Sequence, residues 1–198
     1  KVLPTFTNKI RLVGRNPQKV NDADELFKAD LTNSMEVLKA VAGSNIVYLT
    51  VGLPYNFKVW KQEWPLIMKN VLEACKVHQA KLVFFDNIYM YDSTNLNPIT
   101  ENSPINPPSK KGTIRALIAK MLWDAVETKE VQDLIARSAD FYGPAIDNTS
   151  MLTETVFKPL SQGKKANWMG SSKYKHSFTY TLDAVKATAL LGNTPSAY

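Results

Sequence analysis

Residues 46–51 (IVYLTV) form a continuous run of β-branched, aromatic and aliphatic side chains, and this run restricts the fold more than any other feature of the sequence. A strand with one face in water alternates apolar and polar residues, whereas an unbroken run is typical of a strand buried on both faces. Residues 82–85 (LVFF) are a second such run. Strands of this kind occur mainly in parallel sheets covered by helices, so the sequence predicts an α/β protein.

Helical periodicity separates the expected strands. Ser34 is placed to cap a helix that Gly43 ends, and residues 58–79 and 113–128 carry apolar side chains at helical spacing. Pro65 is expected to divide or kink the helix at 58–79, because proline lacks an N–H donor and its ring crowds the preceding turn. The remaining elements are expected as strands at 10–13, 25–29, 131–136 and 178–181, helices at 151–160 and 183–191, and a long loop at 92–109. Alternating strands and helices predict a parallel sheet with helices on both faces.

Composition excludes several classes of protein. The length of 198 residues predicts one domain, or one domain with a small appendage. The single cysteine, Cys75, excludes a disulfide within the chain, and with only two histidines no metal site is expected. The net charge is +6, but the basic residues are scattered without a run of five, so no nucleic-acid partner is expected. No apolar stretch reaches the length of about 18 residues that a membrane span requires. No signal peptide is visible in a chain that starts at Lys1. A cytoplasmic protein without a membrane partner is therefore expected.

Four segments carry a resemblance to a known family. Residues 29–32 (ADLT) look like an acidic turn after a third strand, and residues 88–91 (IYMY) look like a V-Y-G segment with Asp92 in place of the glycine. Residues 137–144 (RSADFYGP) are similar to an R-x-x-x-x-Y-G-P segment, and residues 176–185 (HSFTYTLDAV) to an R-x-F-x-x-V-x-D-V signature. Each motif alone is weak, but the ordered set resembles the extended short-chain dehydrogenase/reductase family, which includes NAD-dependent epimerases and dehydratases of nucleotide-sugars.

The resemblance implies a Rossmann-type doubly wound parallel sheet with helices on both faces and a small C-terminal substrate-binding part. The family opens with a strand and a G-x-x-G-x-x-G loop that binds the pyrophosphate of a dinucleotide. Residues 10–13 already match the second strand, so the first strand and its glycine-rich loop are expected to be absent from this chain, and a longer native polypeptide is expected. The expected division is an N-terminally incomplete NAD(P)-binding domain at 1–143 and a partial substrate-binding region at 144–198, whose late strand and helix return to the main domain.

The catalytic set of the family is a Ser or Thr followed by Y-x-x-x-K on a helix, and the aligned positions here carry Asn87, Lys111 and Arg115. Asn87 can donate a hydrogen bond to a carbonyl, and Arg115 can bind ribose or phosphate but cannot release a proton. Lys111 is expected to share a helix face with Arg115, whose like charge would favour proton exchange at the amine. The alternative is that Lys111 is a solvated residue at a helix start and that catalysis is lost or carried elsewhere. Tyr91 could supply the missing phenol, or could be a core or rim aromatic residue.

The resemblance also assigns cofactor-binding positions at the ends of the expected strands. Arg15 follows the second strand of the family pattern, where an arginine suits the 2′-phosphate of NADP, so NADP is favoured over NAD. Asp30 and Leu31 would lie near the adenine, although Asp30 could equally cap a turn. The other expected cofactor-binding residues fall into three groups. Thr50, Val51 and Gly52 lie at the end of the strand at 46–51, Asn87 and Arg115 are catalytic positions that also reach the cofactor, and Tyr142 lies in the loop beside the nicotinamide.

Two functions from different classes remain open. The first is an NAD(P)-dependent oxidoreductase or epimerase that acts on a hydroxyl or carbonyl group of a small-molecule substrate, with Lys111 or Tyr91 handling the proton. The habits of the family point to a nucleotide-sugar as that substrate. The second is a non-catalytic dinucleotide-binding protein that senses redox state or binds a partner, which the replaced tyrosine and lysine favour. A homodimer is one expectation, because the helix at 113–128 matches one that dimers of the family often pair.

Overall fold

Parallel strands connected by helices make up the protein. The computed structural model describes residues 2–94, 96, 98–144, 146 and 149–198. Its strands are β1 (Arg11–Gly14), β2 (Glu25–Lys28), β3 (Ile46–Leu49), β4 (Lys81–Asp86), β5 (Asp133–Arg137), β6 (Asp140–Tyr142) and β7 (Phe178–Tyr180). Its α-helices are α1 (Ser34–Val41), α2 (Phe57–His78), α3 (Lys110–Glu127), α4 (Lys158–Ser161) and α5 (Thr181–Gly192).

Within the described residues, the strands form three sheets in which every pairing is parallel. The central sheet has the order β3-β4-β5, and two-stranded sheets are formed by β1 with β2 and by β6 with β7. In the described part of the chain, no strand lies between β1 and β3. The expectation of a Rossmann-like α/β protein is confirmed, and both runs without alternation, at 46–51 and 82–85, contain strands of the central sheet.

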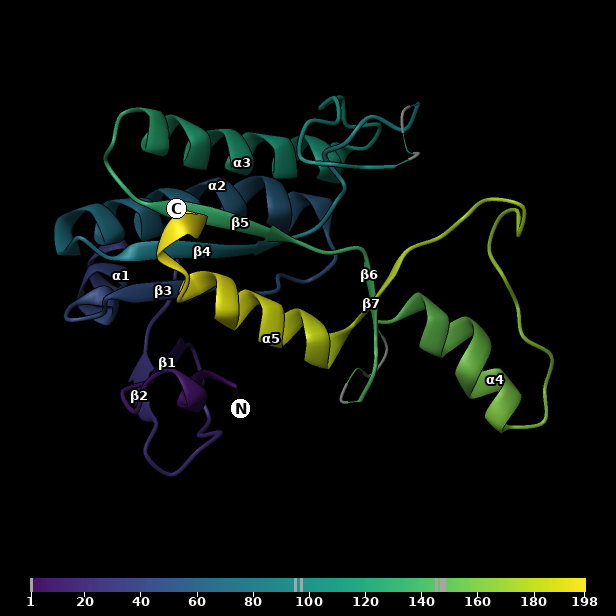
Figure 1. Cartoon of the computed structure of the whole chain (residues 1–198), viewed down its shortest axis with the longest axis horizontal. Helices are drawn as coiled ribbons and strands as arrows, with labels where there is room; N and C mark the ends of the chain where they lie inside the picture. The colour runs from purple at the N-terminus through teal and green to yellow at the C-terminus, as the bar shows by residue number, and fades with distance from the viewer. Residues whose placement is uncertain (1, 95, 97, 145, 147–148) are drawn as a thin grey trace.

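The two faces of the central sheet are covered by different helices (Figure 1). Leu82 and Phe84 of β4 are fully buried in one apolar cluster with side chains of α1, α2 and α3. Because side chains alternate along a strand, the residues between them face the opposite side. On that side Tyr48 of β3, the register partner of Val83, meets Gly192 of α5 so closely that any side chain at position 192 would collide with its ring. The predicted two-sided burial holds for the middle of β4, which is covered by α5 on one face and by α1, α2 and α3 on the other, whereas three of the four residues of β3 are only partly buried.

Of the two effects expected at Pro65, a division of the helix does not occur. Pro65 lies inside one continuous helix, α2, whose buried residues run from Trp60 to Cys75. The carbonyl that loses its partner belongs to Lys61, four residues earlier, which lies on the exposed side of the helix, where water can bind it. Trp64 beside the proline is fully buried, and burial of a large apolar side chain stabilises a fold by roughly 1.5–3 kcal/mol. Packing of this face therefore outweighs the local effect of the proline.

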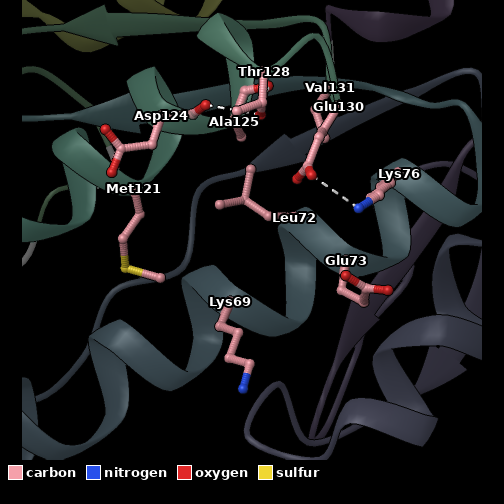
Figure 2. A pocket seen from close by; sticks show the side chains of 10 residues that line it. All are labelled: Lys69, Leu72, Glu73, Lys76, Met121, Asp124, Ala125, Thr128, Glu130 and Val131. Carbon is pink, nitrogen blue, oxygen red and sulfur yellow. Dashed lines mark hydrogen bonds and ion pairs between the residues drawn. The ribbon is translucent and has the colours of Figure 1, made fainter.

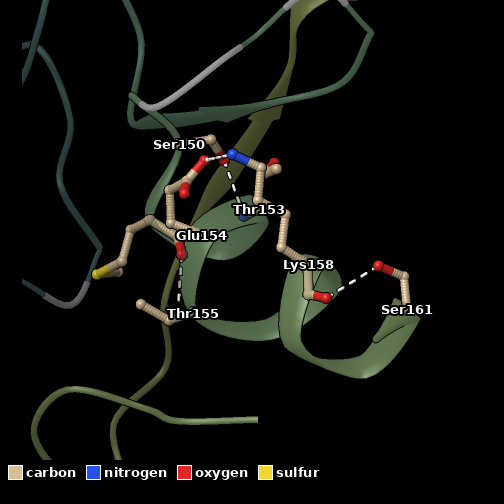
Figure 3. Close-up of polar contacts among 7 residues, drawn as sticks. Ser150, Thr153, Glu154, Thr155, Lys158 and Ser161 are labelled. Atoms are coloured by element: carbon tan, nitrogen blue, oxygen red, sulfur yellow. Dashed lines mark hydrogen bonds and ion pairs between the residues drawn. The ribbon is translucent and has the colours of Figure 1, made fainter. Parts of the chain in front are cut away.

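The C-terminal part begins with a helix held by polar contacts (Figure 3). The buried Ser150 accepts a hydrogen bond from the backbone N–H of Thr153 at 3.1 Å. The next turn, Thr153–Phe157, is a π-helical turn that continues into α4, and a 2.6 Å ion pair joins Lys158 to Glu154 across it. The chain then continues through β7 into α5, which contacts β4 of the central sheet. The division of the chain at residue 143 stays a prediction.

Candidate active site at the carboxyl edge of the sheets

The carboxyl ends of parallel strands lie at the same edge of a sheet. Most of the predicted site residues lie at this edge. In open α/β sheets, ligands bind outside the carboxyl ends of the strands. β1 ends at Gly14, β2 at Lys28, β3 at Leu49 and β4 at Asp86. The residues directly after these ends include the predicted positions Arg15, Asp30, Leu31, Thr50, Val51, Gly52 and Asn87.

Arg15 and Asp30 lie near each other at the ends of adjacent strands. Both are exposed, and the charge of Arg15 helps to lower the pKa of the Asp30 carboxyl. The larger causes of that lowered pKa are hydrogen bonds that the backbone and the hydroxyl of Thr32 donate to Asp30 Oδ1, at 2.9 and 2.7 Å. The backbone N–H of Asp30 donates to Glu36 at 2.7 Å. Asp30 thus stabilises the turn into α1 with one carboxylate oxygen, beside the guanidinium of Arg15.

Leu31 and Gly52 have contrasting surroundings. The carbonyl of Leu31 accepts a hydrogen bond from the buried Asn70 side chain at 3.0 Å, so this acceptor is already engaged within the protein. At Gly52, and likewise at Gly14, an added Cβ would meet no atom within 4 Å. Neither glycine has a positive φ, so neither backbone conformation nor packing within the chain requires glycine there. The open space at these two strand ends is compatible with the close approach of a bound dinucleotide.

A buried charge cluster lies under the end of β4. The Asp86 side chain is completely buried and forms ion pairs with Arg115 Nη1 at 3.2 Å and with Arg137 Nε at 3.6 Å. Burial raises the pKa of Asp86, while the charges of Arg115 and Arg137 act in the opposite direction. Burial also lowers the pKa of Arg115, whose guanidinium stays charged because arginine starts from so high a value. Two cations facing one carboxylate give this cluster a net positive charge.

The two basic residues predicted on one face of α3 do share that face. Arg115 packs its guanidinium 4.2 Å from the ring centroid of Trp64 and 4.8 Å from that of Trp60. Lys111 Nζ lies 2.7 Å from the ring centroid of Tyr55 and donates a hydrogen bond to the Tyr55 carbonyl at 3.2 Å. Lys111 is therefore half-buried on an aromatic ring from the loop before α2, and Arg115 is engaged beneath the site with Asp86.

Tyr91 is buried, and Tyr142, the last residue of β6, packs against the neighbouring strand. Tyr91 is only 5% exposed, forms an antiparallel bridge with Ile105, and its hydroxyl accepts a hydrogen bond from Arg137 at 3.4 Å. This is the environment of a core aromatic residue. Tyr142 on β6 packs against Tyr180 on β7, with ring centroids 5.5 Å apart. Gly143 follows with a φ of +135°, and an added Cβ would collide with Thr181, so this turn requires glycine.

Sequence reasoning missed Tyr89, which lies on the loop after β4. Its backbone N–H donates to Asn87 Oδ1 at 3.0 Å, and its carbonyl lies against Gly112 in the first turn of α3, where any side chain would collide with it. The side chain of Tyr55 is near enough to the Tyr89 phenol to affect its pKa. Burial is the main cause that raises the pKa of Tyr89 to about 12, with smaller contributions from Tyr55 and the charge of Asp140 and an opposing one from Arg115. The available signal was the position itself, two residues after Asn87 beside a strand end.

A second polar pair borders this loop. Asp140 on β6 lies 3.3 Å from His176 Nε2, and the His176 ring stacks on Phe178 with centroids 5.1 Å apart. Trp168 meets both rings edge-on. Asp140 is the same residue whose charge acts on Tyr89, so this cluster from the C-terminal part reaches the loop that follows β4.

A pocket lies between α2 and α3, and Figure 2 shows the side chains that line it. It has a volume of about 370 Å³, and Lys76 and Glu130 close one side of it with a 3.0 Å ion pair. It is formed by the C-terminal halves of both helices, near the start of β4 and β5, and thus far from the strand ends that carry the predicted site. Among the described residues, no three His, Cys, Asp or Glu side chains gather as metal ligands, and no helix is long and apolar enough to cross a membrane.

Comparison with known proteins places these features in a family context. Residues 5–197 match the NAD dependent epimerase/dehydratase family. The chain is similar to the UDP-N-acetylglucosamine 4-epimerase of Bacillus cereus, with 17% identity, a TM-score of 0.80 and coverage of 99% of this chain and 68% of that one. It is also similar to the dTDP-glucose 4,6-dehydratase DesIV of Streptomyces venezuelae with NAD bound (13% identity, TM-score 0.79, 96% of this chain and 64% of that one). A third similar structure is the UDP-glucose 4-epimerase of Thermus thermophilus in complex with NAD (17% identity, TM-score 0.74, 93% of this chain and 66% of that one).

At these identities the likeness shows the fold. The chain spans about two thirds of the length of these solved structures. No curated protein matches the chain.

Proposed function

Because the chain belongs to the NAD dependent epimerase/dehydratase family, we propose that it carries the catalytic edge of an NAD(P)-dependent oxidoreductase or epimerase that acts on a nucleotide-sugar. The observation that carries this proposal is the convergence at the end of β4. The loop with Asn87 packs against the first turn of α3, which holds Lys111 and, one turn later, Arg115. A nucleotide-sugar as substrate is supported by the similar solved structures, which are enzymes of UDP-sugars and dTDP-glucose.

The residues at the strand ends fit a dinucleotide. The open space at Gly14 and Gly52 leaves room for a cofactor to pass close to the backbone. A bound nicotinamide dinucleotide would supply or accept a hydride. Arg15 would bind the 2′-phosphate of NADP. The Oδ2 atom of the neighbouring Asp30 would accept a hydrogen bond from a ribose hydroxyl group of NAD. We extend the proposal to a preference for NADP, which titration with both cofactors tests.

Two residues after β4 and in α3 would prepare the substrate. Asn87 uses its side-chain oxygen on the backbone of Tyr89, and in the described part of the chain its Nδ2 group has no hydrogen-bond partner, so it can donate to a substrate carbonyl. The net positive cluster of Arg115, Arg137 and Asp86 lies beneath and would stabilise negative charge that develops on the substrate oxygen.

Fluorescence titration of the purified full-length protein with NADPH and NADH tests cofactor binding. Trp60 and Trp64 lie at the same edge, so energy transfer to a bound reduced nicotinamide is expected, and excess NADP⁺ or NAD⁺ should abolish it. Saturable binding in the micromolar range, followed by turnover of UDP-glucose, UDP-N-acetylglucosamine or dTDP-glucose, is the expected result. Absence of binding to either cofactor would contradict the proposal.

A non-catalytic dinucleotide-binding protein is the second candidate function. The observation that favours it is the engagement of both basic residues of the motif within the protein, Lys111 with Tyr55 and Arg115 with Asp86. Cofactor binding without turnover of any of these sugar nucleotides would support this second candidate over the first.

A further inference from the structure

Hydride chemistry at a hydroxyl or carbonyl carbon requires a group that exchanges a proton with the substrate oxygen, and the need for such a group here rests on the proposed function. Arg115 is unsuited, because a guanidinium does not release its proton and this one is paired with Asp86. Lys111 points its ammonium group at the ring and the carbonyl of Tyr55. Tyr91 is buried against Arg137. None of these three groups presents an exchangeable proton at the strand edge.

Tyr89 is the phenol at this edge that lies on the same turn as Asn87. It is 37% exposed, whereas Tyr91, two residues later, is 5% exposed. Its backbone is fixed on both sides, by the hydrogen bond to Asn87 and by the close contact of its carbonyl with Gly112. Asn87, which can orient a carbonyl, and Tyr89 are therefore held on one turn in a defined relation to each other.

We propose that the Tyr89 phenol exchanges the proton with the substrate oxygen, in place of the tyrosine that the family motif carries at the position of Lys111. In the direction of reduction, the carbonyl carbon accepts a hydride with its electron pair from the reduced nicotinamide, which is thereby oxidised. The carbonyl oxygen accepts the phenol proton, so the O–H bond of Tyr89 breaks and a new O–H bond forms on the substrate. A phenolate remains, and oxidation of a hydroxyl group runs the same steps in reverse.

The surroundings of Tyr89 suit this role in both protonation states. A tyrosine phenol, whose ordinary pKa is about 10, is protonated at neutral pH, so the resting protein holds a proton donor. When the phenol has lost its proton, the positive charge of Arg115 acts to stabilise the phenolate, and this charge is the one cause that lowers the pKa of Tyr89. Because Arg115 is itself fixed by Asp86 and the Trp64 ring, it supplies this charge without rearrangement.

Tyr55 connects Tyr89 to solvent. Tyr55 acts on the pKa of Tyr89 and is itself 72% exposed, so a proton lost from Tyr89 can be replaced from the solvent around Tyr55. Lys111 lies on the Tyr55 ring, 2.7 Å from its centroid, and Trp60 meets the same ring edge-on at 5.8 Å. Lys111 is thus a positioning residue that holds Tyr55 against Tyr89. The other charged group that acts on Tyr89 is Asp140, which is paired with His176.

Turnover of Tyr89→Phe in the full-length protein tests the proposal, with UDP-glucose, UDP-N-acetylglucosamine and dTDP-glucose as the substrates offered. Removal of the general acid should lower kcat about 100-fold or more, while KM and the affinity for NADPH and NADH stay within a few-fold. Tyr174→Phe is the matched control, because Tyr174 is an 80% exposed tyrosine outside the site, and it should retain full activity. Tyr55→Phe should lower kcat less than Tyr89→Phe does.

The pH profile separates proton transfer from a structural role. Tyr55 is among the causes that raise the pKa of Tyr89, together with burial and Asp140, so Tyr55→Phe should shift the alkaline fall of the reduction rate to lower pH. A Tyr89→Phe variant with wild-type kcat would overturn the role of Tyr89 while leaving the proposed function intact. A wild-type protein that binds neither cofactor, or binds one without turnover, would overturn the proposed function and with it the role of Tyr89.

Discussion

Asp133, at the first position of β5, should make the stability of the protein depend on pH between about 4 and 7. Its Oδ2 atom is buried and has no hydrogen-bond partner in the described part of the chain, and burial raises the pKa of this carboxyl from its ordinary 3.8 to about 7. A pKa that is higher in the folded than in the unfolded state means that the folded protein binds the proton more tightly. The stabilisation by this proton is therefore complete below pH 4 and is lost as the pH rises to 7.

The size of the effect follows from the same two pKa values. Their difference corresponds to about 4 kcal/mol, at 1.36 kcal/mol per pH unit. Because Asp133 is only half-buried and water screens part of the effect, about 2 kcal/mol is the expected change in the free energy of unfolding. Asp133→Asn has nearly the same shape and does not titrate, so this contribution should be missing from its pH dependence.

Urea unfolding of wild type and Asp133→Asn at intervals from pH 4.5 to 8 measures the contribution. Other titrating groups are common to both proteins, so the difference between the two free energies of unfolding isolates Asp133. This difference should shift by about 2 kcal/mol in favour of the variant between the two ends of the range. Asp22→Asn, which removes an exposed loop carboxylate, should show no such shift. A constant difference between wild type and Asp133→Asn would refute the reasoning from burial.

Three further substitutions test the candidate site. Arg15→Ala should weaken NADPH binding by about 1.5–3 kcal/mol, the value of a charge-assisted hydrogen bond, and NADH binding much less; equal losses in parallel fluorescence titrations would contradict the assignment to the 2′-phosphate. Lys111→Met should lower turnover less than Tyr89→Phe does, while the affinity for NADPH and NADH stays within a few-fold, because Tyr55 loses the cation that holds it; unchanged turnover would show that Lys111 does not position Tyr55. Gly112→Ala should destabilise the protein by about 1–3 kcal/mol in urea unfolding, because its Cβ would collide with the Tyr89 carbonyl and the Pro107 ring; a variant as stable as wild type would show that the first turn of α3 can move.

Much of the fold could be predicted from sequence because its signals are local. The unbroken runs at 46–51 and 82–85 contain β3 and β4, and apolar spacing located α2 and α3 to within a few residues. The prediction of a divided helix at Pro65 is wrong. The effect of the proline on the helix was judged from the local backbone alone, whereas the burial of Trp64 and Met68 on both sides of it keeps α2 continuous. Where local cost and tertiary packing compete, the sequence alone does not reveal which is larger.

The site was harder to predict because it depends on contacts between distant segments. The assignment of Asn87, Lys111 and Arg115 to the site stays a prediction, and Tyr91 and Tyr89 are equally plausible phenols in a sequence. What distinguishes them is the bridge between Tyr91 and Ile105 and the contact with Arg137, which turn Tyr91 inward. The partner of Tyr89 is Tyr55, which precedes α2 and carries no recognisable motif. No periodicity or spacing could have joined these two residues.

Departures from the ordinary rules of local structure gather at the carboxyl end of β4. Lys110 and Lys111 occupy the first turn of α3, where the helix dipole disfavours positive charge and where no acidic residue balances it. Asp86 and Arg115 bury charge at a cost that apolar residues of the same size would avoid. A folded protein tolerates such costs mainly where function requires them. A single unfavourable feature does not by itself indicate a functional site. The carboxyl of Asp133 at the opposite end of the sheet has a pKa raised by burial alone, and it lies outside the candidate site. At the end of β4, by contrast, unfavourable features share neighbours: Arg115 is paired with Asp86, and Arg115 and Lys111 both lie over the Trp60 ring, so their charges gather where proton transfer at a substrate oxygen is proposed.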